Sequence, residues 1–275
     1  MAAHSDPSDA GPVPDHALGQ YQAWRAPYDV RTPLDLAWTS VARSASPAAH
    51  RLLPHGEPSI ALLRRRDRSG ALCELEIMVC GPYYQGRFYR PAPREELIAW
   101  RIKPEVAAVL FAIAPEDYSH AAMSAAPPAL KQACAQTLAI GANADAGEIL
   151  SSLNSDLNRF AARRAANTGP EIFAAQWLRD SDGQMRLRDI AARLDVSERH
   201  LRRRFIDHVG CAPKTYARQL QITAAALAAE KAADPDWAEI AAGAGFHDQP
   251  HMINAFRAEL GMTPTAFHAE RRALI

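Results

Sequence analysis

The C-terminal part of the chain repeats itself, and this self-similarity constrains the fold more than any other feature. The segment LRDIAA, which begins at Leu187, matches WAEIAA from Trp237 at an offset of fifty positions. Five further pairs match at an offset of fifty-one: Leu201 with Met252, Phe205 with Phe256, Gly210 with Gly261, Pro213 with Pro264 and Tyr216 with Phe267. The extra residue falls in a turn between matched helices, where it is tolerated. Two copies of one supersecondary unit are predicted.

Each copy is predicted to form a helix, a tight turn and a second helix. Ser197 is a favourable N-cap for a helix that runs to about Val209. Asp195 and Gly245 occupy the same turn position, which we expect to need positive φ, because glycine adopts it freely and aspartate tolerates it. This pattern is typical of a helix-turn-helix, at about 187–209 and about 237–260, whose second helix enters the major groove of DNA.

The second helix of the first unit is rich in arginine on its outer side. At 100° per residue, Arg199 and Arg203 lie opposite the core residues, His200 and Arg202 lie on the flanks, and Arg204 lies nearer the core edge. Arginine can hydrogen-bond guanine with two donors and can contact phosphate. The alternative is an ordinary solvated helix face, and the helix-turn-helix that precedes the run favours the DNA interpretation.

The corresponding helix of the second unit carries amide and imidazole groups instead. Met252, Phe256 and Leu260 form its core stripe, and Pro250 fits its first turn if Asp248 is the cap. The polar side chains that face away from this stripe, or stand at the helix start, are His247, Gln249, His251 and Asn254. Asparagine and glutamine suit adenine edges. A metal site at the two histidines lacks an evident third ligand, and none is predicted.

Charge is distributed unevenly within a neutral total. The chain holds 31 basic and 31 acidic residues, which argues against a protein that coats polyanions without specificity. Residues 193–218 nevertheless carry seven basic and three acidic side chains, whereas residues 243–268 carry one and two. We therefore expect the first unit to supply most of the affinity for phosphates.

The two units are similar to the AraC/XylS family of bacterial transcription regulators. The match covers about 180–272, and its strongest part is EIAAGAGFHDQPHMINAFRAELGMTPTAF, with IAARLDVSERHLRRRF and GCAPKTY in the first unit. The resemblance implies an all-α DNA-binding domain at 170–275, in which a linker helix at about 214–232 joins two helix-turn-helix units. Gln221 on this helix, and Pro250 and Asn254 in the second unit, depart from the residues common in the family.

By position, the resemblance assigns DNA-contacting roles to residues on both second helices. They are Arg199, His200, Arg202, Arg203, Gln249, His251 and Asn254. The partners implied are double-stranded DNA and, as candidates, RNA polymerase, a small-molecule effector and a second copy of the chain. We expect the chain to be a cytoplasmic, sequence-specific transcription regulator that responds to an effector and uses no cofactor.

The N-terminal part is predicted to be β-rich. Residues 1–26 are interpreted as a flexible tail, and short apolar stretches separated by proline and glycine follow at 27–127. Helical periodicity begins at about 104, and residues 128–169 are interpreted as a helical connector that could pack on the β-rich part or support dimerisation. The fold class expected is α+β, with an all-α C-terminal domain.

The N-terminal domain also resembles the cupin-like barrel found as a sensor in one subgroup of the family. The resemblance depends on LLPHGEPSIAL, CGP and WRIKPEVAAVLF. Candidate residues of an effector pocket are His55, Glu57, Tyr83, Tyr84, Trp100 and Arg101. The alternative for them is that the aromatic rings are core and the charged groups belong to turns.

Two other classes of function are an enzyme and a protein that makes only protein contacts through its helical units. Cupin-type metal spacing, a nucleophile elbow, a dinucleotide-binding loop and a Walker loop are all absent from the sequence, so no enzyme is predicted. The sequence contains neither a recognisable signal peptide, which would indicate export, nor an apolar run long enough to span a membrane. The remaining alternative is a small-molecule-binding protein whose helical units make protein contacts only.

Overall fold

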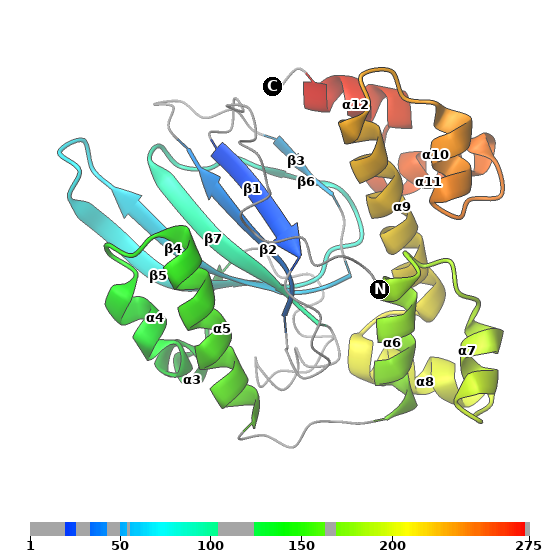
Figure 1. Ribbon diagram of the computed structural model, residues 1–275, viewed down its shortest axis with the longest axis horizontal. Coiled ribbons are helices and arrows are strands. Elements are labelled where there is room, and N and C mark those ends of the chain that lie inside the picture. Colours follow the sequence, from blue (N-terminus) through cyan, green and yellow to red (C-terminus); the bar gives the residue numbers. More distant parts are fainter. Residues whose placement is uncertain are drawn as a thin grey trace, which may run out of the picture.

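The computed structural model describes residues 20–25, 34–42, 50–53, 56–103, 124–162 and 169–272. A β-sheet region with three helices precedes a C-terminal region made only of helices, which confirms the α+β class (Figure 1). The predicted tail up to residue 19 and the helical pattern expected at 104–123 lie outside the described residues. Within the described part, no helix is both long and apolar enough to cross a membrane.

Six strands form one antiparallel sheet in the order β1-β2-β7-β4-β5-β8, and β3 pairs with β6 in a separate two-stranded ribbon. The strands are β1 (Gln20–Arg25), β2 (Leu34–Val41), β3 (His50–Leu52), β4 (Ser59–Arg66), β5 (Leu72–Cys80), β6 (Arg87–Tyr89), β7 (Glu95–Ile102) and β8 (Ser124–Ala125). Strands β2, β4, β5 and β7 all lie in the part of the sequence that is predicted to be β-rich. In the described residues the large sheet is open, because its end strands β1 and β8 do not pair with each other.

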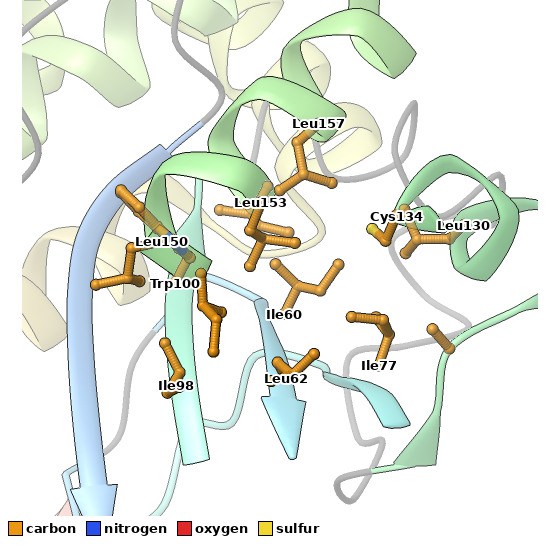
Figure 2. Packing of buried hydrophobic residues seen from close by; sticks show 13 residues of the cluster. Ile60, Leu62, Ile77, Ile98, Trp100, Leu130, Cys134, Leu150, Leu153 and Leu157 are labelled. Atoms are coloured by element: carbon orange, nitrogen blue, oxygen red, sulfur yellow. The ribbon is translucent and has the colours of Figure 1, made fainter. Parts of the chain in front are cut away.

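Three helices, α3 (Pro128–Ala133), α4 (Ala135–Ile140) and α5 (Ala146–Ala162), cover one face of the sheet (Figure 1). Alternate side chains of β4 and β7, among them Ile60 and Ile98, meet Leu153 and Leu157 of α5 in a fully buried core (Figure 2). The strict alternation of the strands brings their apolar residues to this face. The apolar stripe of α5 therefore packs against the sheet of the same chain.

The C-terminal region consists of two short helical units on either side of one long helix. The first unit contains α6 (Pro170–Asp180), α7 (Leu187–Arg193) and α8 (Glu198–Val209), and the second contains α10 (Trp237–Gly243), α11 (Gln249–Leu260) and α12 (Pro264–Arg272). The long helix is α9 (Pro213–Lys231), close to the predicted linker, and it passes between the two units (Figure 1). Each unit has its own apolar core, and α9 contributes to both.

The turns between matched helices have the predicted chemistry. Asp195 and Gly245 both have positive φ, at 53° and 76°. The Ser197 hydroxyl accepts a hydrogen bond from the His200 N–H, and the Asp248 carboxylate accepts one from the His251 N–H, so both predicted N-caps are confirmed. The sequence repeat is therefore a structural repeat down to the capping residues.

Candidate nucleic-acid interface

Helix α8 presents three arginines to solvent on the side away from its core. Leu201, Phe205 and Val209 are buried against α6 and α9. The exposed side chains line a shallow groove of about 330 Å³, which is formed by Arg199, Arg202, Arg203, Ile206 and Asp207. The groove carries three guanidinium groups and one carboxylate, and Arg202 also lies 3.9 Å from Glu198. Guanidinium donors of this kind contact guanine edges and phosphates.

The fourth arginine of the run, Arg204, points in another direction and has a structural role. Its Nε and Nη2 donate to the two carboxylate oxygens of Glu171 on α6 at 2.6 and 2.9 Å, and the Glu171 side chain is fully buried. Burial tends to raise the pKa of Glu171, but hydrogen bonds from Arg204 outweigh it and hold this pKa below its usual range. This bidentate pair ties α8 to α6 and fixes the direction in which the other arginines point.

On α11 the predicted residues have different surroundings. Asn254 is exposed, and Gln249 and His251 are half-buried. The Nε2 of His251 lies 2.8 Å from Nη2 of Arg218 on α9, and its ring packs edge-on against Phe246. Because a guanidinium only donates, Nε2 is the acceptor in this contact, and the His247 N–H lies 3.3 Å from Nδ1 of the same ring. Burial, and then the charge of Arg218, lower the pKa of His251.

Arg218 is a site residue that the sequence did not indicate. Its guanidinium lies over the Phe246 ring at 5.3 Å and next to His251, so it connects α9 to α11. It is 33 residues away from His251 in the chain. Only its inclusion in the basic stretch 193–218 could have drawn attention to it.

Two glutamines hold the units together across the linker helix. The Gln184 amide of the first unit donates to the Gly243 carbonyl at 2.9 Å, and the Gln221 amide of α9 donates to the Gly245 carbonyl at 3.1 Å. Gln221, which departs from the family pattern, thus stabilises the turn before α11. No three His, Cys, Asp or Glu side chains in the described ranges are grouped so that they could bind a metal ion.

The residues proposed for an effector pocket are divided between three places. Trp100 is buried in the core on the helix-covered face of the sheet, and the adjacent Arg101 is on the opposite face, 3.9 Å from Glu57. Tyr83 is buried under the guanidinium of Arg87. Glu57 and Tyr84 contact the C-terminal domain. His55 lies outside the described residues.

Glu259, near the end of α11, is a buried carboxyl group close to Arg218, and its pKa is shifted. Burial raises its pKa to about 7, Arg218 opposes this rise, and its Oε2 has no hydrogen-bond partner within the described part of the chain. A raised carboxyl pKa stabilises the folded state at low pH, and this stability is lost as pH rises from about 4.5 to about 7.

We therefore expect Glu259→Gln to be more stable than the wild type at pH 8, by about 1–3 kcal/mol, and to lose this advantage at pH 5. Urea unfolding at the two pH values measures the difference. Glu239→Gln, a change at an exposed position of α10, is the matched control. A gain for Glu259→Gln that is equal at both pH values would contradict the assignment.

One protein-family model matches the C-terminal part of the chain. Residues 190–270 match the model of a helix-turn-helix domain. No curated protein matches the sequence.

Solved structures are similar either to this domain or to most of the chain. The DNA-binding domain of AdpA, solved with a target DNA, is 29% identical over 38% of this chain and 96% of its own, with a TM-score of 0.36. An AraC-type regulator from Chromobacterium violaceum is 25% identical over 37% and 92%, with a TM-score of 0.34. ToxT from Vibrio cholerae is 11% identical over 92% and 97%, with a TM-score of 0.43.

Proposed function

We propose that this chain is a transcription regulator of the AraC type and reads a specific DNA site with both of its units; residues 190–270 match the model of a helix-turn-helix domain. The observation that carries the proposal is the exposed surface of α8. Arg199, Arg202 and Arg203 are exposed, while the inward-facing Arg204 is neutralised by Glu171.

In this proposal α8 and α11 are the two recognition helices, and they make different kinds of contact with DNA. Helix α8 supplies charge for phosphates and donors for guanine, and α11 supplies the exposed amide of Asn254 for an adenine edge. Helices that enter successive major-groove segments lie about 34 Å apart along the DNA, so one chain would read two adjacent segments. The proposal includes Gln249 and His200 as residues at the edges of these contacts.

Selection of bound sequences from random double-stranded DNA tests the function. We expect one motif with two parts to emerge, and affinity for it at least about 1,000-fold above that for unrelated DNA. Affinity should fall steeply as salt rises, because each neutralised phosphate releases counterions. If no motif were enriched, the helical units would have to serve protein contacts, the alternative class, and the proposal would be wrong.

We also propose that the N-terminal domain is the regulatory part and responds to an acidic small molecule. A groove of about 530 Å³ at the β4–β5 turn is lined by four arginines and two acidic residues. Arg64 is held by Glu96 and by the carbonyls of Gly141 and Ala144, but Arg68 and Arg94 have no side-chain partner in the described part of the chain. Such a groove favours a carboxylate or phosphate ligand.

Calorimetric titration with a panel of organic acids and phosphate esters tests this second proposal. A ligand that binds the wild type with micromolar affinity should bind Arg68→Ala/Arg94→Ala at least about tenfold more weakly, since two charge-assisted contacts are lost. Binding that does not change in the double variant would exclude the groove. The DNA-binding function would be unaffected by that result.

A further inference from the structure

Part of the N-terminal domain is in contact with both helix-turn-helix units and with the helix between them. This part consists of Leu53, residues 56–58 and residues 81–86, and we call it the clamp. Leu53 packs against the core of the second unit, and Tyr84 packs against the core of the first. The two units are therefore connected through the N-terminal domain as well as through α9.

The connection to the first unit is a buried chain of side chains. The Tyr216 hydroxyl on α9 donates to Oε1 of Glu57 at 2.8 Å, and the Glu57 side chain is 2% exposed. The Tyr216 ring packs at a tilt of 54° against Phe205 of α8, with ring centroids 5.7 Å apart. A displacement of Glu57 would therefore act directly on the recognition helix, on the side opposite its exposed arginines.

Backbone of the clamp approaches the linker helix so closely that only glycine fits. A Cβ on Gly56 would lie 2.6 Å from Cδ2 of Tyr216 and 2.7 Å from Oε1 of Gln219. The first of these atoms belongs to a fully buried ring that cannot move aside without repacking. Gly56 thus lets the clamp lie directly on α9.

The connection to the second unit comes from the same loop that holds Tyr84. The Gly86 N–H donates to the backbone carbonyl of Glu259 at 2.8 Å, in the last turn of α11. Residues 84 and 86 are two positions apart, so one short loop touches the core behind α8 and the end of α11. A loop of this kind fixes the distance between the two elements that it bridges.

We infer that the clamp sets the relative position of the two recognition helices, and that Glu57 and Tyr216 are positioning residues which make the chain selective for the spacing between the two parts of its DNA site. This inference depends on the proposed function for its consequence on DNA. One added base pair moves the second half of a site by about 3.4 Å and rotates it by about 35°. A rigid pair of units rejects such a site, whereas units connected only by α9 and its glutamine contacts can adapt to it.

The test uses the full chain with three changes in the clamp contact. Glu57→Ala removes the acceptor, Tyr216→Phe keeps the ring and removes the donor, and Gly56→Ala forces the clamp off α9. Glu57→Gln keeps an oxygen that can accept from Tyr216 and should restore the wild-type behaviour. Arg65→Ala, which removes only an exposed ion pair with Glu74 on the sheet, is the surface control.

Two measurements distinguish a failure of the clamp inference from a failure of the proposed DNA-binding function. Spin labels carried by non-natural amino acids at the exposed positions 192 and 258 report the distance between the units without DNA. We expect a narrow distribution in the wild type, Glu57→Gln and Arg65→Ala, and a clearly broader one in the three clamp variants. Identical distributions in all variants would overturn the inference.

The second readout is affinity for the selected site with one base pair added or removed between its parts. The wild type should lose at least tenfold on either change, and the clamp variants should lose no more than about threefold. Clamp variants that kept the wild-type preference would also overturn the inference. If the wild type selected no site at all, the proposed function would fail, and the label distances would still decide whether the clamp holds the units.

Discussion

Replacing Arg203 by alanine should weaken binding to the selected site by roughly 10- to 100-fold, and the Arg199→Ala/Arg203→Ala double variant should weaken it further. Both side chains are exposed on α8 and have no partner in the part of the chain that the structure describes. Their removal therefore costs the folded protein little and costs the complex two charged contacts. Fluorescence anisotropy with labelled duplexes, at two salt concentrations, measures the loss.

The controls distinguish a contact with a base from a contact with phosphate. If Arg203 contacts a guanine, the variant loses the preference for that base pair, whereas a lost phosphate contact lowers affinity for all sequences and reduces the salt dependence. Arg65→Ala makes the same change of charge on β4, away from α8 and from the proposed effector groove, and should leave binding unchanged. Binding that survived Arg203→Ala but was abolished by Asn254→Ala would show that the second unit dominates, contrary to the charge distribution.

Local features of the helical domain were predictable because they depend on neighbours in the sequence. The N-caps at Ser197 and Asp248 and the left-handed turns at Asp195 and Gly245 follow from the conformational preferences of single residues. The repeat added a second, independent copy of each signal. Capping and turn preferences, applied to both copies of the repeat, were therefore enough to locate α7, α8, α10 and α11.

Contacts across the chain were not predictable in the same way. Arg204 and Glu171 are 33 residues apart, and Glu57 and Tyr216 are 159 apart, so no local pattern connects them. Trp100 and Arg101 were placed together in one pocket, but adjacent residues of a strand point to opposite faces. That separation could have been inferred from the strand itself. The role of Glu57 against α9, in contrast, required the arrangement of the domains.

The largest effect on stability is expected at the buried ion pair between α6 and α8. Arg204→Met should lower the free energy of unfolding by about 3 kcal/mol, because it leaves the fully buried Glu171 carboxylate without its bidentate partner. The side chain of Arg204 is 31% exposed, which keeps the expected loss at the lower end for such pairs. Urea unfolding followed by circular dichroism measures the change.

The pH dependence and a double variant test the cause. In the wild type the lowered pKa of Glu171 stabilises the fold above about pH 4.5, and this contribution is lost as pH falls through the folded-state pKa. In Arg204→Met, protonation of Glu171 relieves the buried charge, so the deficit should shrink between pH 7 and pH 4.5.

Glu171→Gln/Arg204→Met removes both charges and should recover most of the lost stability at pH 7, because a buried pair contributes little more than a neutral replacement. Recovery of stability need not restore DNA binding to the same degree. The two hydrogen bonds from Arg204 also fix how α8 lies on α6, and the exposed arginines follow that orientation. A double variant as unstable as Arg204→Met would show that packing of the long side chain, and not its charge, holds the two helices together.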